Sequence, residues 1–255
     1  MWADGPSAYL GATAMSVSPL VDQYLNRLLV GDRAGCRAFI QEQIVAFEDL
    51  EPLYYDLLWP VMEQVDRLYR SDRINLATEH MATRINRAMA DQVQLRLPAR
   101  APTGKKVVVT CADGEPEELG AQMCADLLES RGWEVYFLGG GVPNDEILSM
   151  LGRIRPELLL VFGSQPSGVP GVRKLIDMIR EIGVNPTMNV MVSGGVFNRA
   201  DGLWREVNAD LTAKTAHQVI PLAESALPRT PTARRPGAPK KRRRRRSPLL
   251  AGAAG

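Results

Sequence analysis

The apolar residues of this chain change their spacing once, across a short linker, and this change constrains the fold more than any other feature. From residue 19 to residue 94 they recur at the spacing of one face of an amphipathic helix. Turn-forming residues divide the stretch into four expected helices, near 19–30, 33–48, 51–70 and 75–94. Because the connections are short, we expect an antiparallel four-helix bundle over residues 19–96.

Residues 97–104 have the composition of a linker. After them the apolar residues follow a different spacing. Apolar strands are expected at 105–111, 133–137, 158–163 and 189–193. They alternate with helices at about 117–131, 143–154 and 169–182, and a last helix follows at about 213–226. This alternation predicts a doubly wound, parallel, Rossmann-like sheet within residues 105–227. The expected fold class is therefore α/β, with an N-terminal helical bundle before the sheet domain.

The two ends of the chain differ in composition from the rest. Residues 1–18 are rich in Gly, Ala and Ser and are expected to be disordered. Residues 229–255 hold ten of the 31 Lys and Arg residues and none of the 29 acidic ones, which leaves the remainder with a net charge of −8. We therefore expect an acidic globule with a disordered basic tail over 228–255. The basic run within 229–246 would bind nucleic acid or another acidic surface through charge alone.

Composition also excludes several functional classes. No apolar run reaches the ~20 residues needed to span a bilayer, and the N-terminus lacks the basic segment of a signal peptide. The three cysteines form no C-x-x-C pair, which favours a reducing cytoplasm. Phosphate-binding loops, H-E-x-x-H and nucleophile–base patterns are missing from the sequence, so nothing indicates enzymatic turnover.

One segment joins the end of an expected strand to the start of an expected helix through a run of carboxylates. It reads Thr110-Cys111-Ala112-Asp113-Gly114-Glu115-Pro116-Glu117-Glu118-Leu119-Gly120. The pattern resembles the Asp/Glu-x-His-x-x-Gly signature of cobalamin-binding domains, with Glu117 at the position of the His that reaches the cobalt. The resemblance implies that Glu115, Glu117 and Gly120 lie at the cofactor.

Three further segments occur in the order found in cobalamin-binding domains. Residues 132–143 resemble their second strand and turn, and Ser164 follows the third strand. A Gly-Gly pair follows the fourth strand, where glycine lets the backbone approach the cofactor's nucleotide tail closely. The resemblance implies cofactor contacts from Leu138, Gly139, Val142, Ser164, Gly194 and Gly195.

The helical bundle carries a further match. In light-responsive cobalamin repressors of this family, a Trp in the bundle is followed after nine residues by Glu-His. Here Tyr69 precedes Glu79-His80 with the same spacing. The resemblance implies that these three residues face the upper side of the corrin. His80 is the candidate metal ligand, because imidazole is the commonest side-chain ligand of metals. Only 18 residues precede the first expected helix, so the winged-helix DNA reader of those repressors is not expected.

Taken with the resemblance, these features predict a cytoplasmic sensor that holds a tetrapyrrole between bundle and sheet. The expected cofactor is cobalamin, as adenosylcobalamin or hydroxocobalamin, and the expected partner is a transcription factor or another regulatory protein. Two alternatives stay open: the same fold holding heme or a bilin, and a cofactor-free scaffold for a protein partner. A corrinoid methyl carrier is less favoured, because such carriers use the lower His that Glu117 replaces. The sequence leaves a homo-oligomer open.

Overall fold

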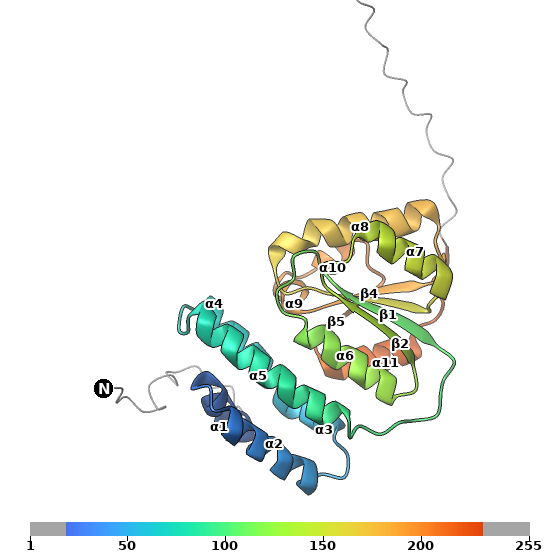
Figure 1. The fold of residues 1–255 in the computed structure, drawn as a ribbon. Coiled ribbons are helices and arrows are strands. Elements are labelled where there is room, and N and C mark those ends of the chain that lie inside the picture. The colour runs from blue at the N-terminus through green and yellow to red at the C-terminus, as the bar shows by residue number, and fades with distance from the viewer. Residues whose placement is uncertain (1–18, 232–255) are drawn as a thin grey trace, which may run out of the picture.

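The structure, a computed structural model that describes residues 19–231, begins with a helical bundle (Figure 1). Its helices are α1 (Pro19–Leu29), α2 (Arg33–Ala46), α3 (Glu51–Leu53) continued by the π-helix η2 (Tyr54–Leu58) and α4 (Trp59–Arg70), and α5 (Leu76–Gln94). The Asp32 carboxylate caps α2, and the Asn75 side chain caps α5 by accepting the Thr78 N–H. The disorder expected for residues 1–18 and for most of the basic tail lies outside the described residues.

The second part of the chain is a parallel sheet of five strands in the order β2-β1-β3-β4-β5. The strands are β1 (Lys106–Cys111), β2 (Glu134–Gly139), β3 (Leu158–Phe162), β4 (Asn189–Ser193) and β5 (Leu211–Ala213). Every residue of β3 and β4 is buried, which explains why these strands are continuous apolar runs in the sequence. Because all the strands are parallel, their carboxyl ends meet along one edge of the sheet.

Helices cover both faces of the sheet, as predicted for a doubly wound fold (Figure 1). One face carries α6 (Leu119–Ser130) and α11 (Ala216–Ser225), and the other carries α7 (Asn144–Ile154) and α8 (Val169–Ile182). Three short elements complete the domain: η3 (Pro166–Gly168), α9 (Gly195–Arg199) and α10 (Leu203–Glu206). The predicted α/β fold class is confirmed. β5 was not predicted, because its three residues are too few to show a period.

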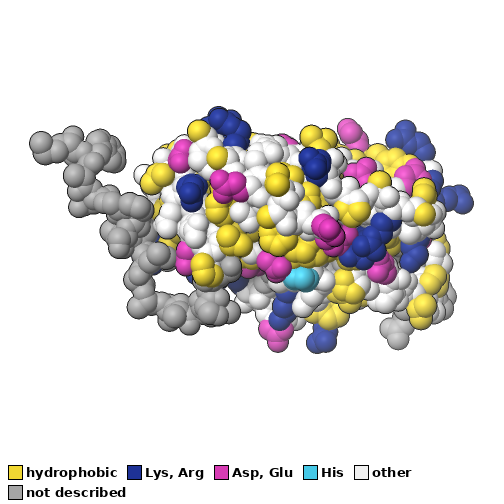
Figure 2. Space-filling view, turned by 90° about the horizontal axis from the view of Figure 1, so that it is seen from below, with side chains coloured by type: hydrophobic (Ala, Val, Ile, Leu, Met, Phe, Trp, Pro, Cys, Tyr) yellow, Lys and Arg dark blue, Asp and Glu magenta, His cyan; other side chains and the backbone are white. Residues whose placement is uncertain are grey.

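The start of the basic tail differs from the expectation that it does not pack. Arg229 lies against the sheet domain, where its Nε donates to Asp210 Oδ1 at 3.0 Å and its main-chain N–H donates to Thr187 O at 2.8 Å. On the face seen in Figure 2, basic and acidic side chains are interspersed. Within residues 19–231 the longest helices are not apolar enough to cross a membrane.

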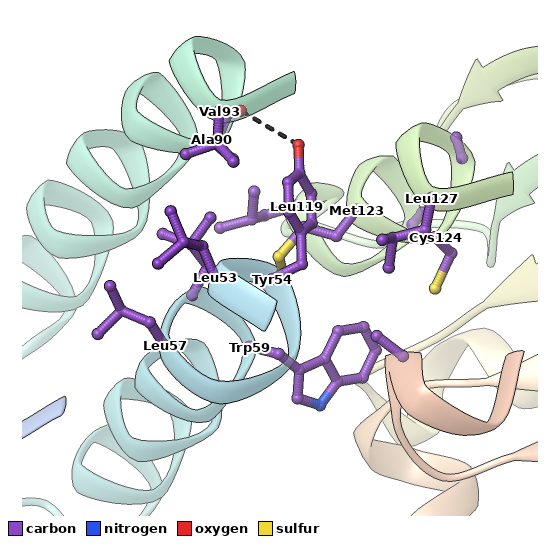
Figure 3. Close-up of a cluster of buried hydrophobic side chains, with 14 of the residues drawn as sticks. Leu53, Tyr54, Leu57, Trp59, Ala90, Val93, Leu119, Met123, Cys124 and Leu127 are labelled. Carbon is purple, nitrogen blue, oxygen red and sulfur yellow. Dashed lines mark hydrogen bonds between the residues drawn. The ribbon is translucent and has the colours of Figure 1, made fainter. Parts of the chain in front are cut away.

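The bundle and the sheet domain share one apolar core (Figure 3). Side chains from the continuous helix formed by α3, η2 and α4 and from α5 meet one face of α6. The labelled residues are Leu53, Tyr54, Leu57, Trp59, Ala90, Val93, Leu119, Met123, Cys124 and Leu127. A buried ion pair reinforces this contact, because the Glu51 side chain is 3% exposed and accepts from Arg131 Nε at 2.9 Å. The bundle is therefore part of the domain's hydrophobic core and not a loosely attached cap.

Candidate functional site

The loop between β1 and α6 lies at the carboxyl edge of the sheet, and two of its carboxylates fasten it to neighbouring strands. The Glu115 carboxylate accepts hydrogen bonds from the main-chain N–H and from the hydroxyl of Ser164, both at 2.5 Å, just after β3. The Glu118 Oε1 atom accepts from the Gly140 N–H at 2.6 Å, just after β2. The two predicted residues Glu115 and Ser164 are thus in direct contact.

Glu117, at the position of the family's metal-binding His, is turned toward its own helix. Its Oε1 accepts from the Leu119 N–H at 2.9 Å, at the first residue of α6. A carboxylate at a helix N-terminus contributes ~0.3–1 kcal/mol to stability. Glu117 also lies near Glu79 of α5: burial raises the pKa of the Glu79 carboxyl and the charge on Glu117 raises it further, while His80 opposes the rise.

Helix α5 faces the loop with basic side chains that the sequence analysis missed. Arg87 Nη2 lies 3.2 Å from Glu118 Oε2, and Arg87 Nε donates to Gln122 Oε1 at 2.9 Å. The available signal was helical spacing, because Arg84 and Arg87 follow His80 at steps of four and three residues on one face of α5. A cavity of about 120 Å³ lies between this face and residues 115–118.

Phe162, the last residue of β3, fills the space beneath the loop on the α6 face of the sheet. Its ring is buried and lies edge-on to Trp59 of the bundle, with ring centroids 6.3 Å apart. A Cβ atom added at Gly120 would lie 2.3 Å from the ring, so only glycine fits there. Gly120, predicted to lie at the cofactor, is therefore packed against Phe162 in this structure.

The remaining predicted residues lie around the same edge or in the bundle. Leu138 and Gly139 end β2, Val142 lies in the loop before α7, and Gly195 begins α9. Gly194 has φ +103°, and a Cβ there would lie 2.3 Å from the Gly163 carbonyl oxygen, so this glycine permits close contact between two loops.

The three bundle residues predicted to face the corrin, Tyr69, Glu79 and His80, differ in their surroundings. Tyr69 is half-buried and packs against the bundle core. The His80 side chain is 46% exposed, with Nε2 3.5 Å from Glu79 Oε2. Among residues 19–231, no three His, Cys, Asp or Glu side chains converge so as to hold a metal ion. The metal-ligand role of His80 stays a prediction.

Comparisons with known proteins match both parts of the fold. Residues 20–93 match one family model described as a B12 binding domain, and residues 105–221 match a second with the same description. These stretches cover most of the chain, which therefore belongs to the B12-binding domain family and carries its paired helical and Rossmann-like domains.

The similar proteins are corrinoid proteins. Dimethylamine corrinoid protein 2 of Methanosarcina mazei is 24% identical over 65% of this chain and 78% of its own length. Monomethylamine corrinoid protein 1 of the same organism is 22% identical over 82% of this chain and 98% of its own. The structure of the Methanosarcina barkeri monomethylamine corrinoid protein superposes with a TM-score of 0.71 at 19% identity, over 80% of this chain and 96% of that one. At this identity the superposition shows the shared fold.

These findings correct three expectations. The predicted sensor function is wrong, and so is the predicted transcription-factor partner, because the relatives are methylamine corrinoid proteins and not light-responsive regulators. The expected likeness to photoreceptors is likewise not supported. The error came from the argument that a chain with Glu117 in place of the metal-binding His is disfavoured as a methyl carrier. The identity of this residue does not decide whether a corrinoid protein transfers a methyl group. Cobalamin binding is supported at the level of the family.

Proposed function

We propose that this chain is a corrinoid methyl carrier that presents its cofactor to methyltransferase partners. The observation that carries the proposal is the pair of B12-binding domains, arranged with the fold of a monomethylamine corrinoid protein. A bound corrinoid supplies a cobalt atom that accepts and releases a methyl group. The residues at the carboxyl edge would hold and orient it.

The polar groups at this edge suit the amide-bearing rim of a corrin. Amides need acceptors and donors, and the edge offers both, from the carboxylates of Glu115 and Glu117 and from the guanidinium groups of Arg84 and Arg87. Glu117 stands at the position of the family's metal-binding His, so a carboxylate in place of an imidazole would lie beside a corrin held at this edge. His80 is our candidate for contact with the upper face.

The cavity between α5 and the β1–α6 loop is too small for a corrin in this structure. The cavity of about 120 Å³ lies below the ~300–1,000 Å³ of small-molecule sites. Binding therefore requires α5 to separate from the β1–α6 loop, which breaks the contact between Arg87 and Glu118. These side chains are 38% and 30% exposed, and exposed ion pairs contribute only ~0–1 kcal/mol, so breaking this ion pair costs little.

Retention of a corrinoid and its methylation test the proposal. The purified chain is incubated with hydroxocobalamin, desalted, reduced to the cobalt(I) form and treated with methyl iodide. We expect a retained corrinoid, and loss of its methyl group to homocysteine when a corrinoid-dependent methyltransferase is added. Hemin and biliverdin serve as alternative ligands. Retention of either of these in place of the corrinoid, or of no ligand, would refute the proposal.

A variant pair tests the opening step. Glu118→Gln removes the charge that holds Arg87 and keeps an oxygen that accepts from Gly140. We expect it to raise the rate of corrinoid association measured by stopped-flow absorbance. The matched control, Glu146→Gln, removes a carboxylate charge at the exposed start of α7 that does not contact α5, and it should leave this rate unchanged.

A further inference from the structure

A cavity of about 260 Å³ lies at the amino edge of the sheet, opposite the candidate corrinoid site. Lys105 precedes β1, Trp133 precedes β2 and Leu158 begins β3, and all three line the cavity. Because the strands are parallel, their amino ends meet at this edge. A cavity of ~150 Å³ holds a molecule the size of benzene, so this one has room for a single ring with a small substituent.

Much of the cavity wall is apolar. The side chains that contribute apolar atoms are Trp133, Pro156, Leu158, Ala223, Ala226 and Pro228. Trp133 is only 4% exposed, and Leu158 and Ala223 belong to the hydrophobic core. A wall of this kind favours the apolar body of a ligand, because binding removes apolar surface from water.

Most polar side chains of the wall are already bonded within the protein. Glu157 Oε2 accepts from the main-chain N–H of Lys106 at 2.6 Å. The side-chain amides of Asn185 and Asn189 donate to main-chain carbonyl oxygens, and the Thr187 hydroxyl donates to Asn185 Oδ1 at 3.5 Å. These contacts hold the wall together, and they leave few acceptors for a ligand that carries N–H or O–H groups.

The polar groups with bonding capacity to spare are all donors. Among residues 19–231, the Arg155 guanidinium has no hydrogen bond or ion pair. The Lys105 ammonium donates one bond, to Glu224 O at 3.2 Å, and retains two further N–H groups. The buried Trp133 Nε1 has no partner in the described part of the chain, although nearly all buried donors have one. A complementary ligand therefore brings acceptor atoms and a negative charge.

Arg155 occupies a position where the backbone does not call for arginine. It follows α7 in the left-handed conformation, with φ +52°, which glycine adopts at a lower steric cost. The dipole of α7 favours a cation at this end of the helix. A guanidinium adds two parallel N–H groups, which match the two oxygen atoms of a carboxylate.

We propose that this cavity binds a small monocarboxylate with an apolar body. The carboxylate accepts hydrogen bonds from Arg155 and Lys105, and the apolar body packs against the wall formed by Trp133, Leu158 and Ala223. The site lies at the opposite edge of the sheet from the candidate corrinoid site, so the inference does not rest on the proposed function.

Isothermal titration calorimetry of the full chain tests the proposal with benzoate as the probe. Acetate lacks the apolar body, and benzyl alcohol lacks the charge. We expect benzoate to bind roughly 10–100-fold more tightly than either, the range of hydrogen bonds to a charged group. Arg155→Gln should weaken benzoate binding by a similar factor. Arg153→Gln, the same loss of charge at an exposed position of α7 outside the cavity, should leave the affinity unchanged.

Two further variants locate the ligand and control for folding. Arg155→Gly suits the left-handed conformation, so it should melt at no lower temperature than the wild type and still lose benzoate binding. Benzoate should change the tryptophan fluorescence of the wild type, because it lies against the Trp133 indole, and this change should be absent from Trp133→Phe. Hydroxocobalamin should be retained equally by the wild type and Arg155→Gln.

Several outcomes would overturn the proposal. They are the absence of benzoate binding, equal affinities for benzoate and acetate, benzoate binding that survives both Arg155 variants, and a fluorescence change that persists in Trp133→Phe. Equal affinities for benzoate and acetate are also the result expected if the basic run within 229–246 alone attracts anions. None of these outcomes affects the carrier function, which is tested by retention and methylation of a corrinoid.

Discussion

The carboxyl group of Asp126 makes the contact between bundle and sheet domain sensitive to pH. Asp126 lies on α6 and accepts a hydrogen bond from the Tyr54 hydroxyl of the bundle at 2.9 Å. Burial raises the pKa of Asp126 to about 7; the charges of Glu129 and Asp91 add to the rise, while the Tyr54 hydrogen bond opposes it. The folded chain therefore binds a proton here between about pH 4 and pH 7 that the unfolded chain has lost.

The sign of the effect follows from this difference in bound protons. Where the folded state binds more protons, the free energy of unfolding falls as the pH rises. A change in one carboxyl pKa from 3.8 to about 7 corresponds to at most about 4 kcal/mol, fully lost above pH 7. Asp126→Asn keeps an oxygen that accepts from Tyr54 and cannot ionise. It should match the wild type near pH 4 and exceed its stability by up to about 4 kcal/mol at pH 8.

Urea unfolding followed by circular dichroism at pH 4 and pH 8 measures this difference. Glu129→Gln is the matched control, because Glu129 acts on Asp126 only through its charge, and its gain at pH 8 should be smaller. The reasoning is refuted if Asp126→Asn is no more stable than the wild type at pH 8, or if its advantage is the same at both pH values.

Other predictions concern the bundle contact, the loop and the linker. Glu51→Ala should lower the free energy of unfolding by ~3–5 kcal/mol in urea, because it leaves the Arg131 guanidinium without its buried partner. Gly120→Ala should lower it by ~1–3 kcal/mol through the clash with Phe162, and the smaller side chain of Phe162→Leu should relieve part of that loss in a thermal melt. Glu117→His, with hydroxocobalamin retained, should shift the visible spectrum toward an imidazole-ligated form; an unchanged spectrum would show that residue 117 does not face the cobalt. The predicted division into two domains requires trypsin to cut first within 97–104 and in the basic tail, and early cleavage inside the sheet domain would contradict it.

The architecture can be predicted from the sequence, because the spacing of apolar residues and the positions of turn-forming residues are local properties. Helix α8 was expected over 169–182 and occupies Val169–Ile182, since Pro170 favours its start and Gly183 adopts the left-handed conformation that ends it. The glycines and carboxylates of the β1–α6 loop identified the family for the same reason, because their order along the chain can be read without knowing what they touch.

The contacts at the carboxyl edge of the sheet, in contrast, depend on how distant segments meet in the fold. The contact of Glu118 with Arg87 spans 31 residues. The packing of Phe162 on Gly120 likewise depends on where strands and helices meet. No local pattern encodes such distances. The residue type of Glu117 is visible in the sequence, but the direction of its carboxylate, toward the start of α6, is set by the folded loop.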